Sequence, residues 1–230
     1  MFRVTFDDAS TVIAHRLILA TGVRDVMPDI ENLADHFGST VFTCPSCDAY
    51  ESRGKAVVVF GFSEFVAGFA IGLLDWAISV TVVTNGQHFE GGPRCRDALQ
   101  RNNIELIEDD VTMLEGEPGT LRAAVLRTGR RVPCEIGFVN IGHEHRDDLF
   151  LQLGCALRDD GCIDVDHDQQ TTVTGVYAAG DISPGPHLIQ VAAAQGAIAG
   201  LAAAQSMRGE AAAAGAPTPA PDPTTELVGS

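Results

Sequence analysis

A strand–helix–strand pattern near the middle of the chain constrains the fold more than any other feature. Residues 56–60 form an uninterrupted apolar run, Ala-Val-Val-Val-Phe, which is typical of a strand buried on both faces of a parallel sheet. Helical spacing of apolar residues follows over 65–76, and a β-rich run covers 79–84. This unit is typical of doubly wound folds, so we predict an α/β fold with a parallel sheet.

Weaker signals lie on both sides of this unit. Residues 2–6 alternate between apolar and polar, and a second run over 11–20 predicts a hairpin. An apolar strand ending in Gly-Asp at 175–181 precedes an Ala-rich segment that predicts a helix over 187–207. The tail over 208–230, rich in Ala, Pro and Thr and without periodicity, is predicted to be disordered.

Composition excludes several classes of protein. The 230 residues carry a net charge of −16, whereas a nucleic-acid-binding protein needs a basic face. No apolar run is long enough to span a bilayer, so we expect no membrane partner. Six cysteines in a chain of this size do not suggest a disulfide scaffold, and we therefore expect a cytoplasmic protein.

Two cysteines three positions apart, Cys44 and Cys47, precede a helical pattern and are followed directly by Asp48. They can close a small disulfide, and a helix N-terminus can depress the pKa of a thiol. The adjacent carboxyl can move the proton that thiol–disulfide exchange requires. The alternatives are a zinc half-site or two buried small residues. Zinc needs about four ligands, and no second pair has this spacing, so the pattern favours redox chemistry.

No metal site is predicted elsewhere in the chain. His143 and His145 alternate along a predicted strand and share a face, but cysteines and carboxylates at matching spacing are missing.

Taken in order, these segments resemble the thioredoxin-reductase-like, FAD-dependent pyridine nucleotide-disulfide oxidoreductases. In that family a Rossmann-like pyridine-nucleotide domain interrupts a flavin domain. The resemblance implies a partial flavin-domain segment over 1–40, an insert with the cysteine pair over 41–142, and a second flavin-domain segment over 143–207. The matching segments are LILATG (17–22), CPSCDAYE (44–51), GKAVVVFG (54–61), IGH (141–143) and GVYAAGD (175–181).

The resemblance also implies roles for single residues. Cys47 matches the cysteine that exchanges electrons with the flavin, Cys44 the one that reacts with the substrate, and Asp48 the general acid/base. FAD would be held by residues of two turns and of the last helix: Thr21, Gly22, Gly180, Asp181, Gln190 and Val191. A strand-ending turn is the alternative for Thr21, and a helix cap is the alternative for Asp181.

Two departures from the family pattern lead to further expectations. No strand–G-x-G-x-x-G–helix unit precedes the first hairpin, so we expect an N-terminally incomplete chain with compromised FAD binding. In the insert, Phe60, Phe62 and Phe65 stand where a nicotinamide site has glycines and a small residue, and Glu64 repels phosphate. No arginine pair follows Thr84, so NADPH binding is predicted to be weak or absent. This pattern resembles the gliotoxin and holomycin dithiol oxidases.

We therefore predict a FAD-dependent thiol–disulfide oxidoreductase that works without NADPH. Phe69, Leu73 and Trp76 are predicted to be core residues of its insert helix. Its substrate would be a small-molecule or peptide dithiol or disulfide, or a thioredoxin-like protein, and the family suggests a homodimer. The alternatives are a conventional NADPH-dependent thioredoxin reductase and a cofactor-free remnant or interaction partner.

Overall fold

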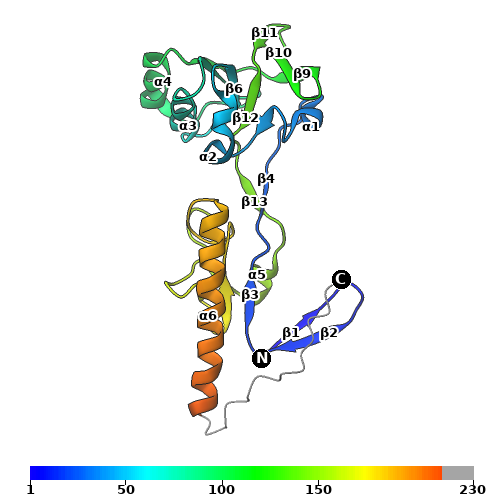
Figure 1. The fold of residues 1–230 in the computed structure, drawn as a ribbon, viewed down its shortest axis with the longest axis vertical. Helices are drawn as coiled ribbons and strands as arrows, with labels where there is room; N and C mark the ends of the chain where they lie inside the picture. The colour runs from blue at the N-terminus through cyan, green and yellow to red at the C-terminus, as the bar shows by residue number, and fades with distance from the viewer. Residues whose placement is uncertain (214–230) are drawn as a thin grey trace. The chain divides into compact units, whose positions relative to one another are not determined.

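The computed structural model describes residues 1–213, and the chain divides into two compact units (Figure 1). The central unit spans Asp25–Glu144, and the discontinuous unit joins residues 1–24 to the segment that begins at His145. The predicted insert, 41–142, lies within the central unit.

A five-stranded sheet forms the middle of the central unit. Its order is β5 (Val41–Phe42), β12 (Ile136–Val139), β6 (Ala56–Phe60), β7 (Ser79–Val83) and β8 (Glu105–Ile107). Every neighbouring pair in it is parallel. The predicted parallel α/β sheet is confirmed, and its two inner strands β6 and β12 have apolar, buried sequences, as expected where both faces of a sheet are covered.

Helices cover one face of this sheet. Val57 and Val59 of β6 pack with α3 (Val66–Leu73) and α4 (Gly92–Arg101). Leu73 is fully buried there, and Phe69 lies edge-on to Phe138 with ring centroids 5.9 Å apart. The short elements α1 (Leu33–His36), α2 (Pro45–Asp48) and the 3₁₀ helix η1 (Ala49–Ser52) precede β6.

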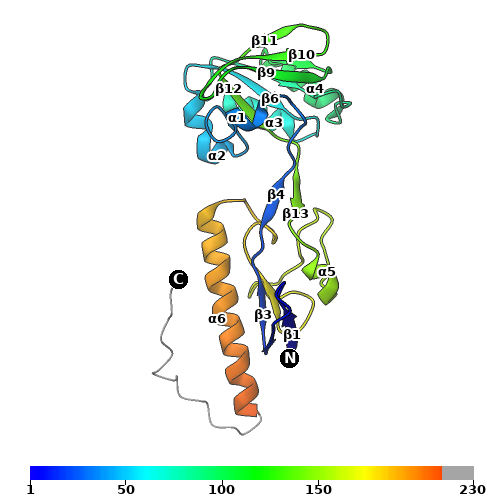
Figure 2. The ribbon, with the colours of Figure 1, turned by 90° about the vertical axis from the view of Figure 1, so that its right-hand side faces the viewer.

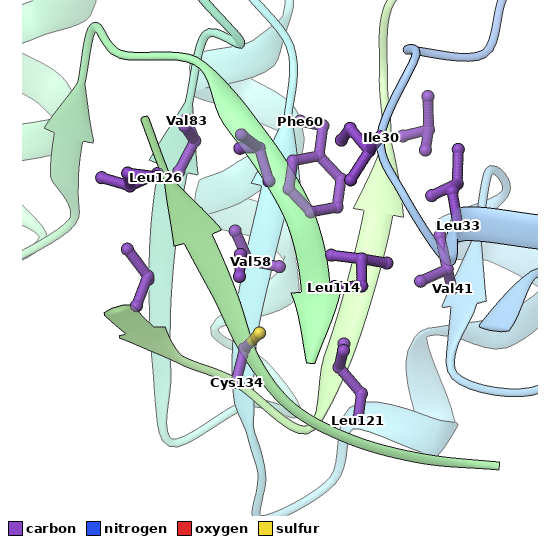
Figure 3. Packing of buried hydrophobic residues seen from close by; sticks show 14 of the residues in the cluster. Ile30, Leu33, Val41, Val58, Phe60, Val83, Leu114, Leu121, Leu126 and Cys134 are labelled. Atoms are coloured by element: carbon purple, nitrogen blue, oxygen red, sulfur yellow. The ribbon is translucent and has the colours of Figure 1, made fainter. Parts of the chain in front are cut away.

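An antiparallel sheet covers the opposite face. It consists of β9 (Val111–Glu117), β10 (Thr120–Leu126) and β11 (Arg131–Pro133). Val58 and Phe60 of β6 pack in the same cluster as side chains from these strands, as Figure 3 shows. The strand β6 therefore contributes alternate side chains to two cores.

Trp76 is not a core residue, contrary to the prediction. The helix α3 ends at Leu73 instead of continuing to 76, and Trp76 is 41% exposed. Its ring lies edge-on to that of Tyr50, with the centroids 5.4 Å apart.

The discontinuous unit begins with the predicted hairpin, β1 (Phe2–Thr5) and β2 (Thr11–Ala14). The second predicted strand, 11–20, is divided, because β3 (Leu17–Leu19) leaves the hairpin and pairs in parallel with β14 (Val176–Ala178). Small buried residues, Ala199 and Ala203 among them, pack the last helix against β14.

That last helix, α6, spans Ile189–Ala213 and runs beside β3 and β14 (Figures 1 and 2). Residues 208–213 are thus helical, although the sequence predicted a disordered tail from 208 onward. The remainder of that prediction, 214–230, lies outside the described residues. A short helix, α5 (Leu149–Leu153), follows the return of the chain from the central unit.

The chain crosses between the units twice, at β4 (Val23–Asp25) and β13 (His143–His145), which form a two-stranded sheet. At the central unit's end of these crossings, the Val26 N–H donates to the Gly142 carbonyl over 3.0 Å. Nδ1 of His143 lies 2.8 Å from the Asp25 carboxylate. None of the helices in residues 1–213 combines the length and the apolar character that a membrane crossing requires.

Candidate functional site

The cysteine pair forms a disulfide at the start of α2. Cys44 is extended (φ −110°, ψ 105°), as expected for a residue before proline, and Pro45 opens the helix where no N–H partner is needed. The Cα atoms of Cys44 and Cys47 are 5.3 Å apart, and the disulfide joins their sulfurs. The carbonyl of Cys44 accepts the N–H groups of Cys47 and Asp48 over 3.2 and 3.0 Å.

The helix at this site is much shorter than the sequence suggested. After four residues α2 passes into η1, so few peptide dipoles are aligned behind the cysteines. The helix dipole that the sequence led us to expect at the cysteine pair is therefore that of a single turn. Cys44 is half-buried and Cys47 is exposed to solvent.

Asp48 has a titration behaviour suited to moving protons. Burial raises the pKa of its carboxyl above the ordinary value, and the negative charge of Glu51 adds to the rise. A carboxyl that holds its proton to higher pH is better matched to exchanging it with a thiol. Tyr50, which sequence reasoning did not single out, lies two residues further on and is 59% exposed. The sequence signal for Tyr50 was an aromatic residue close to the cysteine motif.

The turn after β6 is filled by protein. A Cβ on Gly61 would lie 2.4 Å from the Asn140 carbonyl oxygen and 2.8 Å from Cγ2 of Val66, so this glycine serves close packing. The Phe62 carbonyl accepts the Glu90 N–H over 2.8 Å, and Phe65 is 74% exposed.

Phe60 is not part of the surface of this turn, which corrects the prediction that it fills space needed by a pyrophosphate. Its side chain is fully buried between the two sheets of the central unit (Figure 3). Phe62 and Phe65 remain as the side chains predicted to stand where the family pattern has small residues, and Glu64 remains as the predicted repelling charge.

Arg96 lies on α4, and its side chain has partners within the protein. Its guanidinium donates to Glu108 over 2.9 Å and lies 5.1 Å from the centre of the Phe89 ring. The Arg96 hydrogen bond, with the Phe89 N–H, lowers the pKa of Glu108 to about 2. Both charged side chains are more than a third exposed, so the pair is a surface feature.

A second group of predicted residues meets at one sheet edge in the discontinuous unit. Because β3 and β14 are parallel neighbours, their carboxyl ends lie together, which brings Thr21 and Gly22 near Gly180 and Asp181. Crevices outside such ends are the usual ligand sites of α/β proteins. Gly180 adopts φ +82°, a conformation that favours glycine.

The first turn of α6 adds hydrogen-bond donors. Gln190 is exposed and Val191 is half-buried, and the first N–H groups of a helix have no acceptor within it. Asp181, half-buried, contributes a carboxylate that accepts hydroxyl groups. Backbone donors for a ring with carbonyl oxygens, together with an acceptor for a polyol, fit the chemistry of a flavin.

The histidines at the second crossing have other partners. Nε2 of His145 lies 2.8 Å from the Gly161 carbonyl oxygen. The His145 ring packs on that of Phe150, with the ring centroids 4.4 Å apart. His143 pairs with Asp25. Within residues 1–213, no three His, Cys, Asp or Glu side chains are grouped to hold a metal ion.

Comparison with known proteins agrees with the fold and the motifs. The model of the pyridine nucleotide-disulphide oxidoreductase family matches residues 3–196. The chain belongs to this family.

Individual relatives support the thioredoxin-reductase-like type. Thioredoxin reductase of Helicobacter pylori is 26% identical over 87% of the chain, and an alkyl hydroperoxide reductase component of Pseudomonas putida is 32% identical over 88%. The crystal structure of HlmI superposes with a TM-score of 0.85 at 29% identity over 93% of the chain. The chain spans 68%, 40% and 66% of these three proteins, respectively.

Proposed function

We propose that this protein is a FAD-dependent thiol–disulfide oxidoreductase in which Cys44 and Cys47 exchange electrons with a dithiol or disulfide substrate. The observation that carries the proposal is the disulfide on α2, followed directly by a carboxyl of raised pKa. In this proposal the discontinuous unit is the flavin domain and the central unit is the pyridine-nucleotide-type insert.

The chain's own residues can perform the exchange in two displacements. A substrate thiolate attacks Sγ of Cys44, the Cys44–Cys47 bond breaks, and Cys47 leaves as a thiolate. The second substrate thiolate attacks the substrate sulfur of the mixed disulfide and releases Cys44. In each displacement Asp48 accepts the proton of the attacking substrate thiol and donates it to the cysteine sulfur that departs, so two protons are moved in all. The substrate loses two electrons and two protons, which the cysteine pair gains.

The cofactor would be held in the discontinuous unit. Thr21, Gly22, Gly180 and Asp181 supply the edge for the ribityl chain, and Gln190 and Val191 supply backbone donors toward the ring. A flavin bound there supplies the two-electron acceptor that returns the cysteine pair to the disulfide.

Independence from NADPH is the second part of the proposal. Phe62 and Phe65 occupy the turn where backbone would have to approach a pyrophosphate, and Glu64 adds negative charge. Arg96 is bound to Glu108, which competes with a 2′-phosphate for the guanidinium. A conventional thioredoxin reductase is the alternative, favoured by the name of the relative from Helicobacter pylori.

Flavin chemistry separates these candidates. FAD is titrated into the purified chain, and the reduction of the bound flavin by NADPH and by a small dithiol is followed by stopped-flow absorbance. We expect reduction by the dithiol and none by NADPH. Fast reduction by NADPH would establish the conventional reductase, and a chain that takes up no FAD would leave the cofactor-free partner.

Cysteine variants test the exchange itself. Cys47→Ser is expected to abolish dithiol turnover while the bound flavin stays coloured, because no disulfide can form. Cys162→Ser is the matched control, since this half-buried thiol lies in the discontinuous unit and pairs with no other cysteine. Retained turnover in Cys47→Ser would rule out the mechanism.

Asp48→Asn tests the proton transfer. Turnover should fall about 100-fold, the lower range for loss of a general acid/base. Stability at pH 7 should not fall, because a raised pKa means that the ionised carboxyl disfavours the folded state there. Any gain in the stability of Asp48→Asn over wild type should disappear as the pH falls below the pKa that the Asp48 carboxyl has in the unfolded chain. Thermal melts at pH 7 and pH 3 measure this difference.

Location and assembly complete the proposal. Four cysteines remain as thiols, which fits a reducing compartment such as the cytoplasm. The homodimer rests on the resemblance to the family alone, and light scattering of the purified protein tests it.

A further inference from the structure

The side chain of Gln195, on α6, is buried and forms hydrogen bonds with a single turn of the chain. Its Oε1 accepts the Gly180 N–H over 2.9 Å and the Ser183 hydroxyl over 3.2 Å. Its Nε2 donates to the Pro184 carbonyl over 2.9 Å. Gln195 is 9% exposed, so these contacts are largely shielded from water.

These contacts hold both ends of the segment from Gly180 to Pro184. Between the ends, the Gly180 carbonyl accepts the Ser183 N–H over 2.9 Å and lies 2.8 Å from the Ser183 hydroxyl. The segment is thus a closed turn with Asp181 as its second residue. A Cβ on Gly185 would lie 3.4 Å from Nε2 of Gln195, so the chain also stays close to this amide after the turn.

Gln195 therefore links two elements that are separate in sequence. Asp181 lies on the turn that Gln195 binds, and the first-turn amides at Ile189–Val191 lie on the same helix as Gln195. If these contacts were lost, the Gly180 N–H and the Pro184 carbonyl would be left without the Gln195 amide as partner, and leaving buried polar groups unpaired is costly. The turn and the helix start are thus kept in one arrangement before any ligand arrives.

We propose that Gln195 is a positioning residue that preforms the flavin site by fixing the Gly180–Ser183 turn to α6. This inference rests on the proposed function, because it assumes that Asp181 and the start of α6 contact FAD. Preforming a site lowers the cost of ordering that binding would otherwise carry. The arrangement differs from a helix cap or a packing contact, because one side chain satisfies donors and an acceptor on both flanks of a turn.

The test uses the full chain and two substitutions of Gln195. Gln195→Leu keeps most of the volume and removes all three hydrogen bonds, whereas Gln195→Glu keeps the acceptor oxygen and loses the donor to Pro184. Gln205→Leu is the matched control, since Gln205 is an exposed glutamine of the same helix. The measurements are amide hydrogen exchange over 179–185 without FAD, the Kd for FAD, and the visible circular dichroism of bound flavin.

In Gln195→Leu we expect at least tenfold faster exchange in the turn and at least a tenfold higher Kd for FAD. The dichroism of the remaining bound flavin should change, and Gln195→Glu should lie between this variant and wild type. Gln205→Leu should match wild type. A purely structural role would lower the melting temperature without changing the Kd of the folded protein.

Each other outcome has a defined meaning. If FAD binds to Gln195→Leu within twofold of wild type, the assignment of Gln195 is overturned while the proposed function stands. Unchanged exchange in the turn also overturns the assignment. If Gln195→Leu does not fold, the same criteria apply to Gln195→Glu. If the wild-type chain binds no FAD, the proposed function fails and this inference fails with it.

Discussion

Two turns in this protein each come directly after a buried parallel strand, and they differ in what occupies them. The turn after β6 contains Gly61, whose missing Cβ is replaced by the Asn140 carbonyl and a Val66 methyl group. The turn after β14 contains Gly180, where a Cβ would meet nothing closer than 3.7 Å. Gly61 therefore allows close packing within the protein. Gly180 instead allows a left-handed backbone conformation next to the Asp181 carboxylate.

This difference shows why a glycine after a strand is weak evidence for a nucleotide site. The first turn contains Phe62 and Phe65, and the Phe62 carbonyl accepts a hydrogen bond from the Glu90 N–H. The second turn contains Asp181, and its Gly180 N–H donates a hydrogen bond to the Gln195 side chain. We propose a cofactor site at the second turn alone, and four predictions test this contrast.

The largest expected effect is on folding. Gly61→Ala should lower the free energy of unfolding by about 3 kcal/mol, because the new methyl group overlaps a backbone oxygen that cannot easily move. Gly68→Ala is the control: nothing lies within 4 Å of its Cβ, and alanine in a helix should add about 1 kcal/mol. Urea denaturation measures both. A well-tolerated Gly61→Ala would contradict the close packing of this turn.

The second effect is on cofactor binding by the other turn. Asp181→Ala should raise the Kd for FAD about 10- to 100-fold, the range expected for losing hydrogen bonds to a charged group. Asp159→Ala, at an exposed loop position, should leave the Kd unchanged. Quenching of flavin fluorescence gives both values, and equal Kd values for the two variants would contradict the site.

A third prediction asks whether opening the first turn is sufficient for nucleotide binding. Phe62→Gly combined with Phe65→Ala should still show no fast reduction of the flavin by NADPH, and any rise over the background rate of the wild type should stay below about tenfold, a change of about 1.4 kcal/mol. Glu64 and the pairing of Arg96 with Glu108 remain in place and oppose a phosphate. Stopped-flow absorbance measures the rate, and a larger rise would mean that the two phenylalanines alone exclude NADPH.

The smallest effect concerns the ion pair beside the first turn. Glu108→Gln should destabilise the protein by less than about 1 kcal/mol at pH 7, because the pair is exposed. The pKa of Glu108 is lowered to about 2, so its contribution is complete above about pH 4.5 and declines as the pH falls toward 2. Denaturation at pH 7 and pH 3 should show a smaller difference at the lower pH.

The sequence predicted much of this fold because its strongest signals are local. The apolar run 56–60 specified a buried parallel strand, and the proline after Cys44 accounts for the helix start at Pro45. Which core a side chain enters depends on residues distant in the sequence. Phe60 lies in a core between two sheets, and sequence periodicity did not indicate that these sheets pack together. Trp76 lies outside α3, because this helix ends three residues earlier than predicted.

The candidate site was predictable to a similar degree. The pairing of Cys44 with Cys47 follows from their spacing, and the parallel pairing of β3 with β14 brings two predicted turns to one edge. The role of Gln195 was not predictable, because a glutamine in an alanine-rich helix has no sequence signal for contacts made 11 to 15 residues earlier in the chain.

The paired crossings between the two units have a consequence for the order of folding. The 120 residues from Asp25 to Glu144 (144 − 25 + 1) interrupt the discontinuous unit. Closing a flexible loop of that length costs about 4 kcal/mol of chain entropy. Once the central unit is folded, the Val26–Gly142 hydrogen bond already holds its ends together, and this cost no longer opposes the pairing of β3 with β14. Refolding should therefore complete the central unit first.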